Sequence, residues 1–186
     1  EVLLPAIEQA CLQAKIKIEE VDLFVCTIGP GSFTGLRIGA ATLKGFLLAA
    51  DKPAAGVSSL TALALNAGKT SKRICSVMDA GRGQVYTARF EYDKDGLLKQ
   101  IGDEHILNPA DVKTDAENEV VVMDSAAARY ADMMALDQHA IPSQQYIRAS
   151  SVGILGREKY ARNELLNADT FAPLYLRSAD AQLKKA

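Results

Sequence analysis

The segment Gly29-Pro30-Gly31-Ser32-Phe33-Thr34-Gly35-Leu36-Arg37-Ile38-Gly39 joins a hydrophobic strand to a hydrophobic helix through a loop that carries few side chains. The run before it, residues 23–28, is rich in β-branched and aromatic residues, which is typical of a strand covered on both faces. The glycines of the loop let the backbone take positive φ angles and approach a neighbouring surface closely. Ser32 or Thr34 can cap the helix that follows.

This loop is a candidate anion or nucleotide site, because amide groups at the start of a helix attract anions. Its candidate residues are Gly29, Gly31, Ser32, Thr34 and Gly35. A Walker loop would end in Gly-Lys-Ser/Thr, whereas Leu36 and Arg37 follow Gly35 here. A dinucleotide fingerprint would need a glycine where Thr34 stands. A tight turn with close helix packing is therefore favoured, and a phosphate role is the alternative.

The helix predicted over residues 36–50 is apolar around almost its whole circumference, and its only charges are Arg37 and Lys44. Such a helix must be covered on more than one side, either by its own domain or by a second protein. Gly39 and Gly45 offer flat places where another backbone can come close. The pattern favours contact with a partner.

A second helix, predicted over residues 2–16, is apolar along one side. We expect the two helices to lie side by side and to present a shared apolar surface. The residues predicted to bind a partner there are Leu3, Leu4, Ile7, Cys11, Leu36, Arg37, Gly39, Leu43, Phe46 and Leu47. The alternative is that both helices only cover the sheet of their own lobe.

Further strands are predicted over residues 54–57, 74–78, 84–92 and 120–123, and further helices over residues 60–67, 126–136 and 151–166. Residues 174–176 are expected to be extended. A polar stretch at residues 68–72 separates two apolar blocks, which predicts an N-terminal lobe of residues 1–69 and a C-terminal lobe of residues 70–186. The first lobe has only two strand candidates, and two parallel strands cannot bury the helices attached to them. We therefore expect this lobe to lack its N-terminal strands.

Composition narrows the function classes. With 21 Lys and Arg against 23 Asp and Glu, the net charge of −2 gives no general attraction to a polyanion such as a nucleic acid. The three cysteines lie in apolar contexts, which indicates buried thiols in a reducing compartment, so a cytoplasmic location is expected. The histidines, His105 and His139, form no pair with metal-ligand spacing. No apolar run reaches the roughly eighteen residues of a membrane span.

The turn Asp79-Ala80-Gly81-Arg82-Gly83 links two predicted strands. An aspartate at a strand end can hold magnesium, but with no second carboxylate expected nearby, an Asx-type turn is the favoured interpretation. Neither Ser32 nor Ser58 lies in a Gly-x-Ser-x-Gly elbow. No catalytic residue and no metal ligand are assigned.

Four landmarks occur in order along the chain: residues 29–39, Gly56-Val57-Ser58-Ser59-Leu60, Asp79-Ala80-Gly81-Arg82-Gly83-Gln84-Val85-Tyr86 and Pro173-Leu174-Tyr175-Leu176-Arg177. Together they resemble the bacterial TsaB (YeaZ) family. The resemblance implies an α/β fold of the actin-like, Hsp70-like ATPase (ribonuclease H-like) type with two lobes.

The resemblance also implies a function. A member of this family would be a non-catalytic subunit required for threonylcarbamoyl transfer to adenosine 37 of tRNAs reading ANN codons. Such a subunit would dimerise with a TsaD-like paralogue and help to recruit a TsaE-like ATPase. A second copy of the same chain is the alternative partner for the helix surface. The complex would use ATP and Mg, and no cofactor is assigned to this chain. The alternative is an ATPase-like, kinase-like or peptidase-like enzyme of the same fold.

Overall fold

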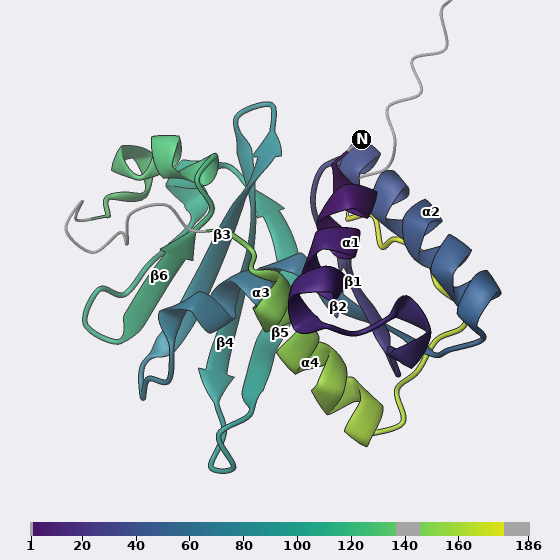
Figure 1. Cartoon of the computed structure of the whole chain (residues 1–186). Helices are drawn as coiled ribbons and strands as arrows, with labels where there is room; N and C mark the ends of the chain where they lie inside the picture. The colour runs from purple at the N-terminus through teal and green to yellow at the C-terminus, as the bar shows by residue number, and fades with distance from the viewer. Residues whose placement is uncertain (1, 137–145, 177–186) are drawn as a thin grey trace, which may run out of the picture.

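The computed structural model describes residues 2–136 and 146–176. Predictions that concern His139 and Arg177 lie outside these described residues. Within them the chain forms two β-sheets with helices packed around and between them (Figure 1).

The first sheet has two parallel strands, β1 (Phe24–Gly29) and β2 (Ala54–Ser58). The second sheet has the order β5-β4-β3-β6 and is built from β3 (Arg73–Gly81), β4 (Gln84–Tyr92), β5 (Leu98–Leu107) and β6 (Glu119–Met123). In it β3, β4 and β5 form an antiparallel meander, and β6 runs parallel to β3. The strands predicted from the sequence are confirmed, and β5 is an additional strand.

Helix α2 (Phe33–Ala50) connects the two strands of the first sheet. It begins where the hydroxyl of Ser32 accepts a hydrogen bond from the amide of Gly35 at 3.3 Å, and it ends where Asp51 takes a left-handed conformation. Its buried residues recur with helical spacing and face β1: they are Leu36, Ala40, Leu43 and Leu47. Ala40, Leu43 and Leu47 share a core with Phe24 of β1 and with Phe171, far along the chain.

Helix α3 (Ser59–Ala64) lies between the two sheets (Figure 1). Leu60 and Leu63 pack with Ile74 and Phe90 in the core of the second sheet. On its other side, Ala62 packs in a smaller cluster with residues of β2 and of α4 (Ala149–Ala161). A short 3-10 turn, Leu65–Ala67, follows α3. This packing makes α3 the common wall of two hydrophobic cores.

Several predicted helices differ in the structure. Residues 126–136 form two 3-10 turns, Ala127–Tyr130 and Asp132–Met134, because Asp124 caps the amide of Ala127 and the left-handed Ala135 ends the segment. Helix α4 ends at Ala161 and not at residue 166, since Leu166 pairs with Ala54 through two 2.8 Å hydrogen bonds. Helix α2 begins three residues earlier than predicted.

The chain returns to the first sheet after the second sheet is complete. Helix α4 crosses β1 at Gly156, where a Cβ atom would come within 2.6 Å of Cγ1 of Val25. Phe171 is buried in the core of the first sheet, and the amide of Leu174 donates to the carbonyl of Ile28 at 2.7 Å. The division into lobes of residues 1–69 and 70–186 stays a prediction. It does not account for the residues after the second sheet that pack against the first sheet.

Candidate functional site

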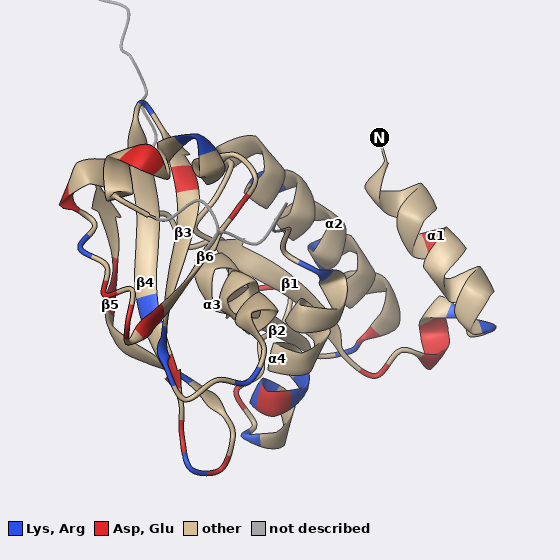
Figure 2. Cartoon of the chain, turned by 90° about the vertical axis from the view of Figure 1, so that its left-hand side faces the viewer, with Lys and Arg blue, Asp and Glu red and all other residues tan. Residues whose placement is uncertain are grey.

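Helix α1 (Leu3–Ala14) has no buried residue, although much of it is apolar. Its side chains at Leu3, Leu4 and Leu12 are exposed, and only Ile7 and Cys11 are half-buried. Figure 2 shows α1 standing apart from α2 and from the sheets. An isolated helix of this length is marginal in water, because helix formation needs packing of an apolar face. The exposed helix therefore presents a surface suited to being covered.

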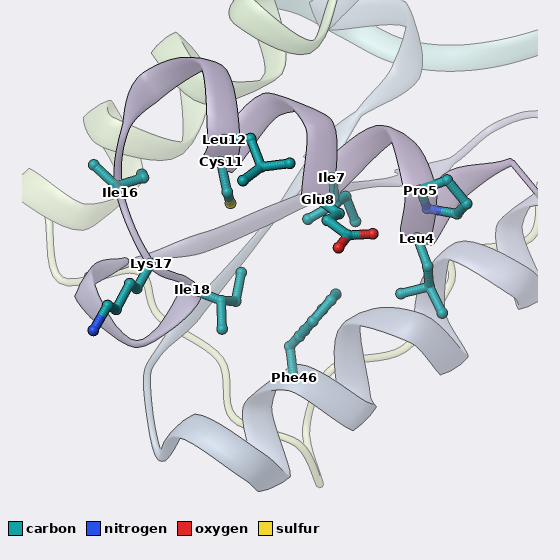
Figure 3. A pocket seen from close by; sticks show the side chains of 10 residues that line it. All are labelled: Leu4, Pro5, Ile7, Glu8, Cys11, Leu12, Ile16, Lys17, Ile18 and Phe46. Carbon is teal, nitrogen blue, oxygen red and sulfur yellow. The ribbon is translucent and has the colours of Figure 1, made fainter.

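A groove of about 550 Å³ separates α1 from α2. Figure 3 shows its lining: Phe46 points from α2 toward α1, and Ile7 and Ile18 lie opposite it. A second space of about 290 Å³ continues beneath α1 to β1 and is lined by Ile7, Cys11 and Phe46 together with Phe24 and Cys26. Both spaces are lined mainly by apolar residues, and the charged residues at the first groove are Glu8 and Lys17.

The outer face of α2 carries a second apolar stripe. Ile38, Ala41, Gly45 and Leu48 are all exposed, and their spacing of three and four residues places them on one face of the helix. Leu48 is 77% exposed and Ile38 is 52% exposed. Sequence reasoning did not select these residues, because a helix that is apolar all round does not reveal which face points outward.

Three of the residues assigned to a partner are buried within the chain itself. Leu36, Leu43 and Leu47 face β1, as described above, and Gly39 lies against the sulfur of Cys26. The ring of Phe46 stacks on that of Phe24 with 5.5 Å between centroids. Contact of these residues with a partner stays a prediction. Their side chains belong to the core of the first sheet, so the exposed apolar surface of α2 comes from other residues.

Arg37 is held at the start of α2 by aromatic contacts. Its guanidinium lies 4.0 Å from the ring centroid of Phe33, and the other neighbour of Phe33 is Tyr175, at 4.7 Å between centroids. These contacts attach residues 173–176 to the first turn of α2. The arginine predicted to lie at the rim of a partner surface is therefore exposed but ordered by its own chain.

Close packing explains the first glycine of the glycine-rich loop. Gly29 has a φ of 127°, and a side chain there would collide with the carbonyl oxygen of Leu174. Ser32 caps the helix, so its hydroxyl oxygen already accepts a hydrogen bond. Gly31 and Gly35 meet no close neighbour that would exclude a side chain. These observations support the tight-turn interpretation, and an anion role for Gly29, Gly31, Ser32, Thr34 and Gly35 stays a prediction.

Asp79 lies at the end of β3 and forms the predicted Asx turn by accepting the amide of Gly81 at 3.0 Å. The expectation that no second carboxylate lies nearby is wrong. Asp124, at the end of the neighbouring parallel strand β6, accepts the amide of Asp79 at 3.4 Å. Burial raises the pKa of Asp124, and the charge of Asp79 adds to this effect. Arg129 pairs with Asp79 at 2.8 Å and neutralises its charge.

The described residues contain no group of three or more His, Cys, Asp or Glu side chains arranged to hold a metal ion. Cys75 is buried beside Thr87, and burial raises the pKa of its thiol. Cys26 is half-buried, and burial also raises its thiol pKa. His105 is exposed on β5. Nor does any helix of residues 2–136 and 146–176 have the length and apolar character needed to cross a bilayer.

The two sheets, their connections and the helix between them define an α/β protein of the actin-like, ribonuclease H-like class. A family model described as TsaD, tRNA N6-adenosine threonylcarbamoyltransferase, matches residues 1–185, and the chain belongs to this family. Several of its curated relatives carry the name TsaB, and solved structures similar to it carry the name YeaZ.

The individual relatives agree over most of the chain. The tRNA threonylcarbamoyladenosine biosynthesis protein TsaB of Bacillus subtilis is 29% identical over 97% of this chain and 80% of that protein. The TsaB protein of Haemophilus influenzae is 24% identical over 95% of this chain and 78% of that protein. The crystal structure of a protein from Pseudomonas aeruginosa, described as similar to peptidase YEAZ, superposes with a TM-score of 0.82 at 27% identity, covering 94% of this chain and 82% of the other.

Proposed function

We propose that this chain is a non-catalytic scaffold subunit in the formation of threonylcarbamoyladenosine in tRNA. It acts by binding a TsaD-like paralogue through α1 and the outer face of α2, and it helps to recruit a TsaE-like ATPase. The modification is the one that the names of its curated relatives describe. ATP and Mg are used by the complex, and tRNA is contacted by the other subunits.

One observation carries the scaffold role. The apolar residues of α1 and the stripe of Ile38, Ala41, Gly45 and Leu48 on α2 are exposed in the chain by itself. Large exposed apolar surfaces of soluble proteins mark interaction sites. The small residues Ala41 and Gly45 at the middle of the stripe allow the backbone of a partner helix to approach closely. Lys44 and Arg37 flank the stripe. Charges at the rim of an interface affect the orientation of the bound partner more than its affinity.

The test is to replace Ile38 with glutamate and measure association with the TsaD-like paralogue by calorimetry. We expect at least a tenfold weaker association, because a charge would be buried against apolar partner atoms, which corresponds to roughly 1.4 kcal/mol or more. The thermal unfolding midpoint of the free chain should stay within about 2 °C of the unsubstituted value, since the side chain is exposed.

The chain offers a matched control at Ile154 on α4, which is 51% exposed against 52% for Ile38. Ile154→Glu should leave association unchanged, because this residue lies on a different surface. Equal loss in both variants, or full binding by Ile38→Glu, would refute the proposed surface. Size measurement of the free chain over a concentration series separates homodimer formation from pairing with the paralogue.

An ATPase-like, kinase-like or peptidase-like enzyme is the alternative. A reconstituted threonylcarbamoyl transfer assay with the TsaD-like and TsaE-like proteins distinguishes the two roles. Under the scaffold proposal, transfer requires this chain, and substitutions at Asp79 or Ser58 that preserve folding leave the rate within about twofold. Transfer that proceeds equally well without the chain would count against the proposal.

A further inference from the structure

Helix α2 carries two charged residues, Arg37 and Lys44, and both are positive. The sequence of the helix has no Asp or Glu, and Asp51, where the helix ends, is the first acidic residue after them. Seven residues advance an α-helix by about 10.5 Å and turn it almost twice, so the two cations lie in one row along it. This row borders the exposed apolar stripe of α2.

The row of cations lies on the side of α2 that faces away from α1. Nine positions separate Arg37 from Phe46, which corresponds to about two and a half helical turns, so the two side chains leave the helix on opposite sides. Phe46 points toward α1 (Figure 3). The surface proposed to bind a partner is therefore apolar from α1 across the outer face of α2, and it has a positively charged margin beyond the stripe.

An aromatic ring holds the guanidinium of Arg37. Its Cζ atom lies 4.0 Å from the ring centroid of Phe33, one helical turn earlier. Within residues 2–136 and 146–176 no carboxylate forms an ion pair with Arg37. A guanidinium presents five N–H donors in a planar fork that matches the two oxygens of a carboxylate. Arg37 is thus ordered by its own chain in a way that leaves the fork for an acceptor from outside these residues.

Phe33 is itself supported from the far end of the chain. Its ring contacts that of Tyr175 with 4.7 Å between centroids. The backbone beside Tyr175 is fixed, because the amide of Leu174 donates to the carbonyl of Ile28 at 2.7 Å. Residues 173–176, which belong to the fourth sequence landmark, therefore support the side chain that orders Arg37.

The positive row indicates the charge of the surface that fits it. An apolar stripe with cations along one margin is complementary to an apolar stripe with carboxylates along the matching margin. The two exposed helices of this chain do not supply that complement. Helix α2 has no acidic residue, and the only acidic residue in the sequence of α1 is Glu8, which lines the groove between α1 and α2. The complement therefore favours a different protein over a second copy.

We infer that Phe33 and Tyr175 position the guanidinium of Arg37 to bind a carboxylate of the TsaD-like paralogue. A second carboxylate, about two turns along a partner helix, would meet Lys44. The inference rests on the proposed function, because it names the partner's chemistry at the same surface. Arg37 makes the contact, whereas Phe33 and Tyr175 act through it. A side chain that is ordered before binding loses less conformational entropy when the complex forms.

The test is calorimetry of association with the TsaD-like paralogue at about 50 mM and about 500 mM salt. The unsubstituted chain should bind more weakly at high salt, because salt screens an exposed ion pair. Arg37→Gln should weaken association about fivefold at low salt and should reduce its dependence on salt. Tyr175→Ala should weaken it about threefold, since Arg37 is less ordered. Tyr175→Phe keeps the ring and should bind as the unsubstituted chain does.

A double-mutant cycle distinguishes positioning from direct contact. If Tyr175 acts only through Arg37, Tyr175→Ala has no further effect in a chain that already carries Arg37→Gln. An effect of full size in the double variant would overturn the positioning role. Arg37→Gln and Tyr175→Phe give an answer even if Tyr175→Ala lowers the stability of the chain.

The outcomes separate this inference from the proposed function. If Ile38→Glu weakens association while Arg37→Gln leaves both affinity and salt dependence unchanged, the surface is correct and the role of Arg37 is wrong. If neither substitution weakens association, both proposals are wrong. Self-association that Arg37→Gln abolishes would place the carboxylate on a second copy instead.

An apolar stripe beside cations also fits an anionic membrane surface. Vesicles of phosphatidylserine and phosphatidylcholine are the probe for this alternative, and we expect the unsubstituted chain not to sediment with them. Binding to these vesicles that Arg37→Gln abolishes would overturn the assignment of Arg37 to a protein partner.

Discussion

At the scale of single residues, glycine has different roles in the two long helices. Gly156 in α4 is buried against Val25 of β1, and a methyl group there has no room. Gly45 in α2 is exposed, and an added Cβ would meet no atom within 4 Å. The sequence shows both as glycines inside helices, which cost stability relative to alanine. Their opposite surroundings give opposite expectations for the same substitution.

Gly156→Ala should lower stability, because overpacking at Val25 costs about 1–3 kcal/mol and exceeds the gain in helix propensity of about 1 kcal/mol. Gly45→Ala should raise stability by about 0.5–1 kcal/mol, since it gains propensity without a clash. Urea unfolding of the two variants measures both changes. Stabilisation by both substitutions would show that α4 moves away from β1 easily.

At the scale of elements, α2 has an inner and an outer apolar face, and its sequence does not distinguish them. Helical periodicity located this helix, and the prediction that a second protein covers its other side stays a prediction. Periodicity assigned Leu36, Leu43 and Leu47 to a partner, whereas all three are buried within the chain, and Leu43 and Leu47 lie in the core with Phe24 and Phe171. Residues 127–134 have the periodicity of a helix but form two 3-10 turns in the structure. Local patterns locate elements but do not orient them.

The adjacent residues Leu47 and Leu48 test this orientation. Leu47 is 4% exposed, so Leu47→Ala should reduce the free energy of unfolding by about 2–5 kcal/mol through loss of burial and creation of a cavity. Leu48→Ala should change it by less than about 0.5 kcal/mol. Chemical denaturation compares the two variants. Equal effects would mean that α2 is rotated relative to the arrangement described.

At the scale of the whole molecule, the core of the first sheet is completed from the far end of the chain. Phe171 packs with Phe24 and Leu43 although more than a hundred residues, including the entire second sheet, separate it from them in sequence. Leu166 and Leu174 add backbone hydrogen bonds to Ala54 and Ile28. The chain therefore passes from the first sheet to the second through α3 and returns to the first sheet after the second sheet is complete.

Phe171→Ala should cost about 3–5 kcal/mol of stability and should weaken the first sheet in particular, because the ring is 1% exposed in its core. Tyr175→Ala is the control, since Tyr175 is 40% exposed and stacks only at the surface. Hydrogen exchange of the β1 and β2 amides locates the effect. If the Phe171 variant is as mild as the Tyr175 variant, the return of the chain contributes little to the first sheet.

The sequence by itself determined the strands other than β5, the main helices and the glycine turn before α2, because hydrophobic periodicity and glycine placement act over short distances. The four landmarks were also sufficient to identify the family. Only the tertiary structure decided which face of α2 points outward, that Asp124 and Arg129 meet Asp79, and that β5 reaches Ser58 through Glu104. These arrangements join residues far apart in the chain, and nothing in the local pattern of either partner specifies the other.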